Sequence, residues 1–478
     1  MNIRGPILVF LFFSLSIPGS SSVLVHWSSS TVPPANALGM RDLVISWNDR
    51  TLPLLNDAHR RGYRVYIETS LQQAAVVAEK VSKLGAEGII VNVPQSQRAA
   101  LESALPRLKS DYPKLRFMVL SAEGKLPQMR GSLVLKRDSV LEVSSPTAQP
   151  WIDTNLSLIK IERKANDEQT PLYTFSWLRP DAGQQERELT ATDYSLAVSE
   201  AGAFRADLVL DVDEQLQEAL NAKEPIAWKL WKEVLNYTDF YSRDKTDPRL
   251  EAAANVAVIV DDLDPGDEVM NLMARHNIPF KVFRAPDLQP KVLEDFEVIV
   301  VFAKPDQESG QRIAELATHG KTFVLVDGQG SYPWHNTEAI RLNEHATSYT
   351  VGKGKVLELS EAVTDPETFS QDIRRLLGKD HALISLWNGL TTIAVPYSNN
   401  GRDVEEIEFI NYAAGPLQVQ VQVKGSFRSV QYESPEHACC ESLAPVQHSG
   451  FTEFVIPELQ IAGRVHLVAE EVRRSHGR

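Results

Sequence analysis

Short apolar runs recur along the first half of the chain, and most are separated by a segment long enough for a helix. Eight runs stand out, and their sequences are VLVHW, DLVISW, YRVYIET, GIIVNV, RFMVLS, SVLEVSS, PLYTFSW and DLVLDVD. Continuous apolar runs of this length suit strands that are buried on both faces, as in a parallel sheet. Their alternation with helical segments predicts a (β/α)8 barrel over residues 23–243, with functional side chains at the C-terminal ends of its strands. The link between the first two runs has little helix signal, so we expect the first helix to be reduced.

The pattern changes twice in the second half of the chain. After the polar segment SRDKTDPR, apolar runs and helical segments alternate again over residues 251–378, which predicts an open α/β domain. Over residues 380–474 apolar and polar positions alternate with period two, and Gly, Pro and Asn separate the runs. That pattern predicts a small antiparallel β-sandwich. Three domains also suit the length of 478 residues.

The chain begins with a pattern typical of secreted proteins. A basic start, the apolar stretch GPILVFLFFSLSIPG and small residues predict a signal peptide over residues 1–22. The alternative is an uncleaved anchor, although the stretch is short for a spanning helix. No later segment is long and apolar enough to span a bilayer, so we expect an exported protein without membrane contact after cleavage. The net charge of −14 disfavours nucleic acid as a partner.

The sequence offers little support for a cofactor or a metal. It contains no nucleotide-binding motif of the GxGxxG or P-loop type, so we expect no cofactor. The only two cysteines, Cys439 and Cys440, are adjacent, and a disulfide between neighbours is rare and strained, which favours free thiols. His437 and His448 lie near the cysteines, but their spacing matches no zinc pattern, and we predict no metal site.

Several carboxylates lie near the run ends, where barrel chemistry is expected. Glycoside hydrolysis requires two facing carboxylates, one as acid and one as base or nucleophile. Glu68 and Asp211 form the best candidate pair, with Asp153 and Glu142 in reserve. Each has a structural alternative: Glu68 could form a structural ion pair, and Asp211 suits the dipole of the helix that follows it. Asp153 could cap the next helix, and Glu142, in the middle of the sixth run, could have a structural role.

Aromatic and amide side chains also occur at the run ends. Aromatic rings there could stack on sugars, because a sugar ring presents apolar C–H groups to a flat π surface. The alternative is that the tryptophans fill the barrel core. The candidate substrate-binding residues are Trp27, Trp47, Asn92, Trp151 and Trp177.

The order of a barrel, an open α/β domain and a β-sandwich resembles the β-galactosidase-type glycoside hydrolases of bacteria. In the middle domain, VGKGKVLEL and KTFVLVDG look like strands of the amidotransferase-like domain of those enzymes. The resemblance covers most of residues 23–478 and is carried by the order of the domains. It implies a carbohydrate partner and a homo-oligomer, a trimer in that family, formed through the amidotransferase-like domain.

The chain departs from this family where the family places its catalytic residues. The family has an acid/base Glu, preceded by Asn, after strand four, and a nucleophile Glu after strand seven. Here Asn92 is followed by Val93 and Pro94, and the seventh run ends with Ser176 and Trp177. Residues 251–378 also contain no Cys, so the amidotransferase-like domain lacks that chemistry.

Two hypotheses follow. The chain is a divergent glycosidase that uses Glu68 and Asp211, or it is a non-catalytic relative that binds a glycan or serves as an assembly scaffold. The residues slightly favour the second hypothesis.

Overall fold

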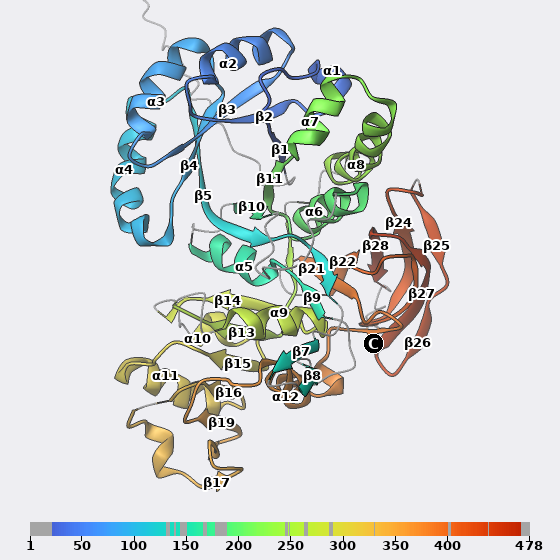
Figure 1. The fold of residues 1–478 in the computed structure, drawn as a ribbon. Helices are drawn as coiled ribbons and strands as arrows, with labels where there is room; N and C mark the ends of the chain where they lie inside the picture. The colour runs from blue at the N-terminus through green and yellow to red at the C-terminus, as the bar shows by residue number, and fades with distance from the viewer. Residues whose placement is uncertain are drawn as a thin grey trace, which may run out of the picture.

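The structure is a computed structural model. It describes residues 22–130, 134–137, 140–143, 151–165, 170–176, 189–243, 247, 249–261, 266–285, 290–328, 330–399, 403–437 and 439–469. Figure 1 shows a barrel at one end, an open sheet at the other end, and two antiparallel sheets of the C-terminal part beside them.

Seven parallel strands close the barrel. Their order around it is β1, β11, β10, β5, β4, β3 and β2. The strands are β1 (Val23–His26), β2 (Asp42–Ser46), β3 (Arg64–Ser70), β4 (Gly88–Asn92), β5 (Arg116–Lys125), β10 (Leu172–Ser176) and β11 (Asp207–Asp211). A closed barrel with alternating helices confirms the predicted architecture, although the number of strands differs from the expected eight.

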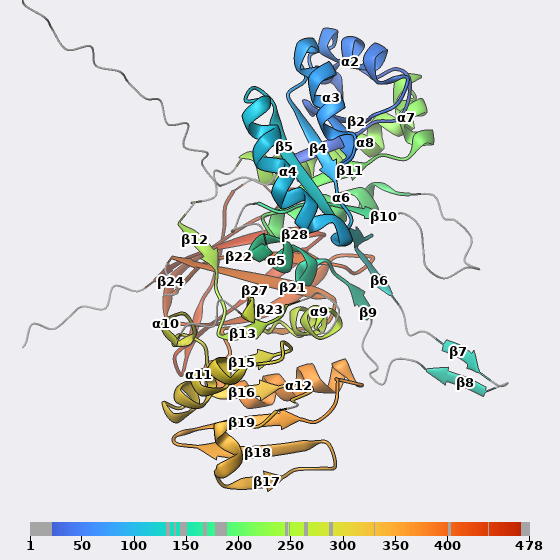
Figure 2. The same ribbon diagram turned by 90° about the vertical axis from the view of Figure 1, so that its left-hand side faces the viewer.

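The sixth apolar run is the one that does not join the barrel. Its residues form β8 (Val140–Val143), which pairs antiparallel with β7 (Val134–Arg137) in a sheet of two strands. Figure 2 shows this hairpin standing away from the body of the molecule. β5 pairs directly with β10 as far as Lys125 and Ser176, so no edge remains between them for another strand. A second small pair, β6 (Gln128–Arg130) and β9 (Trp151–Asp153), lies in the same connection.

Helices surround the barrel. The first connection contains only the four-residue helix α1, which confirms the expected reduction. The last helix, α8, is amphipathic and buries one face that includes Trp231, Tyr237 and Tyr241. The helices are α1 (Ala35–Leu38), α2 (Thr51–Arg60), α3 (Ala74–Val81), α4 (Arg98–Asp111), α5 (Leu156–Ala165), α6 (Ala191–Ala203), α7 (Glu214–Asn221) and α8 (Pro225–Arg243), with 3-10 helices at Ser82–Leu84 and Gln95–Gln97.

The inside of the barrel is filled by one small apolar cluster. Because successive side chains on a strand point to opposite faces, every second residue faces the interior. The cluster consists of Leu24, Val44, Tyr66, Ile90, Met118, Leu120, Leu172 and Val209. The intervening residues, such as Val25 and Leu43, belong to the larger core between strands and helices. Burying one such aliphatic side chain stabilises the fold by about 1.5–3 kcal/mol.

The open sheet has the strand order β14, β13, β15, β16, β19, β18 and β17, and its first five strands are parallel. β18 and β17 add an antiparallel edge. The strands are β13 (Val256–Ile259), β14 (Phe280–Phe283), β15 (Val298–Val301), β16 (Thr322–Leu325), β17 (Ala339–Arg341), β18 (Ala346–Val351) and β19 (Gly354–Leu359). The helices are α9 (Asp267–Arg275), α10 (Pro290–Leu293), α11 (Gln307–Thr318) and α12 (Pro366–Leu377), with 3-10 helices at Pro333–Asn336 and Lys379–His381.

Two antiparallel sheets form the C-terminal part and share an apolar core, as the period-two pattern predicts. The larger has the order β12, β21, β22, β28, β24 and β25, and the smaller has β20, β23, β27 and β26. The strands are β12 (Leu250–Ala252), β20 (Ile384–Trp387), β21 (Thr392–Asn399), β22 (Val404–Asn411), β23 (Leu417–Lys424), β24 (Phe427–Glu433), β25 (Glu441–Leu443), β26 (Val446–His448), β27 (Phe451–Leu459) and β28 (Ala462–Ala469). β12 precedes the open sheet in sequence, so the chain enters the C-terminal sheet first.

Among the described residues, no helix is both long enough and apolar enough to cross a membrane.

Candidate functional site at the barrel rim

A polar layer lies next to the apolar barrel interior, at the C-terminal ends of the strands. On six strands the residue two positions after an interior residue is polar or charged, so the same alternation points it towards the barrel mouth. On β10 this residue is Thr174, whose hydroxyl donates to the carbonyl of Val209 at 3.1 Å. We call the other five residues the rim cluster. They are His26 on β1, Ser46 on β2, Glu68 on β3, Asn92 on β4 and Asp211 on β11.

His26 connects the rim cluster. Its Nδ1 lies 2.8 Å from Oδ1 of Asp211, and its Nε2 lies 2.9 Å from Oγ of Ser46. Oε2 of Glu68 is 3.7 Å from the same Nε2. Asn92 donates from Nδ2 to Oε1 of Glu68 at 3.2 Å. The structure therefore brings together the predicted pair, Glu68 and Asp211, and the predicted amide, Asn92.

The rim cluster is partly open to solvent and carries an excess of carboxylates. The side chains of His26 and Glu68 are each 19% exposed, and that of Asp211 is 40% exposed, so a ligand can reach all three. Burial lowers the pKa of His26, but the hydrogen bond and charge of Asp211 and the charge of Glu68 outweigh it. The net result is that the pKa of His26 is raised from its ordinary 6.5. Within the described residues, no lysine or arginine forms an ion pair with Glu68 or Asp211.

A buried amide holds the loop next to His26 in place. Gln217 on α7 is fully buried, and its Oε1 accepts the backbone N–H groups of Ser28 at 3.0 Å and Ser29 at 2.9 Å. Its Nε2 donates to the carbonyl of Val212 at 2.6 Å. One side chain thus ties the segment after β1 to the segment after β11, and it fixes the spacing between His26 and Asp211.

The helix-terminal role that was the alternative for Asp211 belongs to Asp213. Asp213 is the N-cap residue of α7, and its Oδ1 accepts the backbone N–H groups of Gln215 at 2.9 Å and Leu216 at 3.3 Å. Asp211 is the last residue of β11 and contacts His26 instead.

The two tryptophans at the first run ends point away from the rim cluster. Trp27 is fully buried in the core between strands and helices, and its Nε1 donates to the carbonyl of Thr31 at 2.7 Å. Its ring therefore offers no surface for stacking on a sugar. Trp47 is half-buried and packs against the same core, with Nζ of Lys80 5.4 Å from its ring centre. Both rings occupy outward positions, so the alternative that they fill the barrel core is also wrong: they pack in the layer between strands and helices.

The remaining candidates come from the connection between β5 and β10. Glu142 lies in β8, which pairs with β7 outside the barrel, so the expectation that it sits in the middle of a barrel strand is wrong. Trp151 and Asp153 lie in β9, which is also outside the barrel sheet, and their side chains are outside the described part of the structure. Trp177 lies outside the described residues altogether. Roles of Trp151, Asp153 and Trp177 at the site stay predictions.

His26 and Ser46 were not among the residues that the sequence suggested. A signal for them exists in the strands themselves, because His26 and Ser46 follow the interior residues Leu24 and Val44 by two positions. The large aromatic residues at the run ends, Trp27 and Trp47, are the outward-facing neighbours of these two residues. The alternation of inward and outward positions along each strand is therefore the signal that identifies His26 and Ser46.

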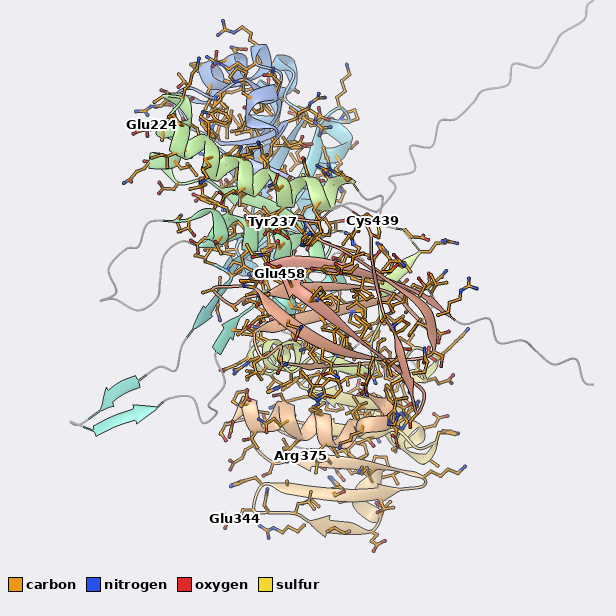
Figure 3. All side chains as sticks on the ribbon, turned by 90° about the vertical axis from the view of Figure 1, so that its right-hand side faces the viewer. Glu224, Tyr237, Glu344, Arg375, Cys439 and Glu458 are labelled. Carbon is orange, nitrogen blue, oxygen red and sulfur yellow. A yellow bond between two sulfur atoms is a disulfide. The ribbon has the colours of Figure 1, made fainter. Side chains whose placement is uncertain are left out.

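A second charged group lies where α8 meets the C-terminal sheets, and we call it the interface cluster. Its members are Arg205, Glu406, Glu408, Glu433, Arg464 and His466. A cavity of about 600 Å³ opens beside it, lined by residues that include Phe240, Arg243, Glu433, His437 and His466. In Figure 3, Tyr237 of α8 and Cys439 are labelled in this boundary region.

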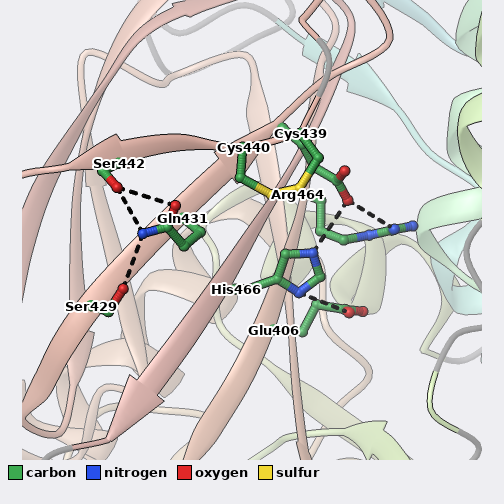
Figure 4. The surroundings of a disulfide bond; sticks show 9 residues. Glu406, Ser429, Gln431, Cys439, Cys440, Ser442, Arg464 and His466 are labelled. Atoms are coloured by element: carbon green, nitrogen blue, oxygen red, sulfur yellow. Dashed lines mark hydrogen bonds and ion pairs between the residues drawn. A yellow bond between two sulfur atoms is a disulfide. The ribbon is translucent and has the colours of Figure 1, made fainter.

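Cys439 also borders this cavity, and the structure joins it to Cys440 in a disulfide (Figure 4). The expectation of free thiols is therefore wrong for this structure. The two sulfur atoms and a carboxylate oxygen of Glu433 lie within 4.8 Å of one another. While the sulfurs are bonded to each other, neither offers the thiolate that a zinc site of this kind requires.

Comparisons with known proteins identify relatives only through structure. No protein-family model matches the sequence, and no curated protein is significantly similar to it. The α-L-fucosidase isoenzyme 2 of Paenibacillus thiaminolyticus superimposes with a TM-score of 0.58 and 10% identity, over 95% of this chain and 100% of that one. A catalytic mutant of Gan42B, a GH42 β-galactosidase from G. stearothermophilus, superimposes with a TM-score of 0.54 and 8% identity, over 94% of this chain and 98% of that one.

Both similarities extend over nearly the whole of each chain, so the order of the barrel, the open sheet and the C-terminal sheets is shared as well as the barrel itself. At such low identity the comparisons establish the fold alone. The chain therefore has the fold of the β-galactosidase-type glycoside hydrolases that its domain order resembles.

Proposed function

We propose that this protein is exported, binds a carbohydrate at the barrel rim, and does not cleave glycosidic bonds. The observation that carries the proposal is the rim cluster, which presents carboxylate, amide, imidazole and hydroxyl groups together at the barrel mouth. Sugar hydroxyls both donate and accept hydrogen bonds, so convergent acceptors and donors of this kind suit them. The position also agrees with the fold, since barrels of this type bind their ligands at the C-terminal ends of the strands.

The position of His26 argues against glycoside hydrolysis. Two-carboxylate hydrolysis requires the two carboxyl groups to flank the glycosidic bond, one of them delivering a proton to the leaving oxygen. Here both carboxylates contact one imidazole, with Asp211 at 2.8 Å and Glu68 at 3.7 Å. The ring of His26 therefore occupies the space between Glu68 and Asp211 in which a glycosidic bond would have to bind.

The sequence around the rim supports the same conclusion. Asn92 ends β4, and the next residue is the buried Val93 instead of a glutamate. The residues after β10 lie outside the described residues, and their sequence begins with Trp177 instead of a glutamate.

A divergent glycosidase is the alternative function. It is favoured by the placement of Glu68 and Asp211, which lie on opposite sides of a single imidazole ring at the barrel mouth. If the ring moved, the two carboxylates would face each other across a space where a glycosidic bond could bind. The two functions differ in turnover, which a hydrolysis screen measures.

A glycan array and a hydrolysis screen on the purified mature chain test the proposal together. We expect the chain to retain a small set of array glycans and to release no sugar from a broad panel of glycosides. Glu68→Gln should weaken this retention at least about tenfold, which corresponds to about 1.4 kcal/mol. Glu344→Gln, an exposed change in the turn between β17 and β18 (Figure 3), is the matched control and should bind like wild type. Turnover of any glycoside, lost in Glu68→Gln, would establish the alternative, whereas a chain that neither retains a glycan nor releases a sugar would overturn both.

Export and assembly need their own tests. The signal peptide over residues 1–22 falls almost wholly outside the described residues. N-terminal sequencing of protein recovered from outside the cytoplasm should find a start near residue 23, whereas an intact Met1 would contradict cleavage. The homo-oligomer that the family resemblance implies also stays a prediction, and light scattering of the mature chain would measure its mass.

A further inference from the structure

We propose that Ser46, His26 and Asp211 form a nucleophile, base and orienting acid that hydrolyse acyl esters, and that the substrate is an acylated carbohydrate. The substrate class rests on the proposed function, because the sugar part of the ester would occupy the rim. The relay itself rests on the geometry of three side chains.

The geometry has the connectivity that nucleophilic serine chemistry requires. Asp211 accepts at 2.8 Å from Nδ1 of His26, which places the hydrogen of the neutral ring on Nδ1. Nε2 is then free to accept the hydroxyl hydrogen of Ser46 at 2.9 Å. Both distances lie inside the range of about 2.6–3.2 Å within which such groups exchange protons. The serine is therefore in contact with a base that is itself oriented by an acid.

The scaffold holds the three residues on adjacent strands. β11, β1 and β2 are neighbours in the barrel, and His26 is the direct register partner of Asp211. Ser46 is the last residue of β2. The register partner of His26 on that strand is Val44, two residues before Ser46. Strand ends in a closed barrel fix side chains more firmly than loops do, which favours a preorganised relay. The described chain uses Ser46 Oγ for no other hydrogen bond.

The reaction is balanced with water as the only co-reactant. Oγ of Ser46 attacks the ester carbonyl carbon, and its proton passes to Nε2 of His26. The bond from the carbonyl carbon to the sugar oxygen then breaks, and His26 returns the proton to that oxygen. Water next attacks the acyl-serine, giving a proton to His26, and the bond to Oγ breaks with reprotonation of Ser46. Asp211 and Glu68 both stabilise the imidazolium formed in each step.

Active-site labelling is the first test. The probes are a fluorophosphonate, which phosphonylates activated serines, and 4-nitrophenyl acetate together with O-acetylated oligosaccharides as esters. We expect the label on the peptide that contains Ser46, and we expect acetate release. Ser46→Ala should lose the label and at least about 100-fold of the ester turnover. Ser348→Ala, a half-buried serine on β18, is the matched control and should keep both.

The pH profile separates chemistry from a merely structural role. Four side chains of the rim cluster surround His26: Asp211 from β11, Ser46 from β2, Glu68 from β3 and, through Glu68, Asn92 from β4. The base must be neutral, so kcat/KM for the ester should rise with pH through the pKa of His26, above 6.5. Glu68→Gln removes one of the charges that raise this pKa, so the rise should move to lower pH.

The outcomes distinguish this inference from the proposed function. An absence of label on Ser46, or wild-type ester turnover in a folded Ser46→Ala variant, overturns the relay even if glycans bind. Ester turnover that depends on Ser46 supports the relay even if the array retains no glycan. If the rise of kcat/KM with pH occurs at the same pH in Glu68→Gln as in wild type, His26 is not the base.

Discussion

In the described part of the chain two histidines each lie between two carboxylates, and their surroundings differ. His26 at the barrel rim lies between Asp211 and Glu68, at 2.8 and 3.7 Å. His466 in the interface cluster lies between Glu433 and Glu406, at 3.2 and 3.6 Å (Figure 4). The neighbouring carboxylates raise the pKa of both rings, and the largest cause at His466 is the hydrogen bond that its Nε2 makes to the carboxylate of Glu433.

The difference is in what else the carboxylates contact. In the interface cluster each has an arginine as well: Arg464 lies 3.2 Å from Glu433, and Arg205 lies 2.9 Å from Glu406. At the rim the described residues supply no such cation for Glu68 or Asp211. A histidine between two carboxylates thus occurs in both places. In the interface cluster arginines neutralise the carboxylates. At the barrel mouth the carboxylates keep hydrogen-bond acceptors to spare. Unneutralised, accessible carboxylates are what a ligand with many hydroxyls can use.

Removing the buried arginine should give the largest effect. The Arg464 side chain is 2% exposed, its Nε donates to Glu408 at 2.6 Å, and its guanidinium lies 4.9 Å from the ring centre of Phe240 on α8. Arg464→Met leaves Glu408 buried without its cation, so the free energy of unfolding should fall by about 3–5 kcal/mol. Denaturant unfolding measures this loss.

The double variant Glu408→Gln/Arg464→Met is the control for that prediction, because it removes both charges and should recover part of the lost stability. If the free energy of unfolding of Arg464→Met falls by less than about 1 kcal/mol, the interface cluster stabilises the fold no more than an exposed ion pair does.

The helix layer that covers the interface cluster provides the next test. Gly202 on α6 has no room for a side chain, because an added Cβ would overlap the ring of Tyr241 on α8. Gly202→Ala should therefore lower the free energy of unfolding by about 1–3 kcal/mol. Gly415→Ala is the matched control, since a Cβ there meets nothing within 4 Å. Equal melting temperatures for the two variants would contradict the close packing of α8 on α6.

Substitutions at the rim should affect stability least and binding most. The side chain of Asp211 is 40% exposed, and exposed ion pairs contribute about 0–1 kcal/mol. The free energy of unfolding of Asp211→Asn should therefore lie within about 1 kcal/mol of that of wild type. The variant should nevertheless lose affinity for the glycans that the array retains. A variant that unfolds as readily as Arg464→Met would place the rim cluster among the structural groups.

The titration of His26 gives the smallest and most specific effect. Its raised pKa means that protonated His26 stabilises the fold fully below about pH 6.5, and that this stabilisation is lost as pH rises through the folded-state value. Asp211→Asn should lower the pKa of His26, measured by NMR of the imidazole, and leave that of His466 unchanged. A His26 pKa that does not respond to Asp211→Asn would contradict the 2.8 Å contact.

The sequence predicts much of the fold because its apolar periodicity survives in the structure. Seven of the eight runs form barrel strands, and the period-two segment forms the C-terminal sheets. The prediction that the sixth run is a barrel strand is wrong. The residues VLEV do form a strand, as their composition indicates, but this strand pairs with β7 outside the barrel. Local sequence specifies that a segment is extended, whereas its pairing partner depends on which sheet edges remain open.

The sequence predicts part of the site, namely the polar residues at the strand ends, but not the direction in which each side chain faces. Glu68, Asn92 and Asp211 are polar residues at strand ends and were found from position alone. Trp27 was selected by its size, yet its fully buried ring faces the helices. His26 and Ser46 were missed because facing direction depends on the register of the strands, which the run boundaries alone do not fix.

Binding at the rim can be separated from binding elsewhere by one NMR measurement. Protein labelled with ¹⁵N-histidine is titrated with an oligosaccharide that the array retains, and the His26 and His466 signals are assigned from His26→Gln and His466→Gln. If the carbohydrate binds at the barrel mouth, the His26 imidazole signals should shift with saturation while those of His466 stay in place. Saturable shifts of His466 with a stationary His26 would place the sugar beside the interface cluster and contradict the account.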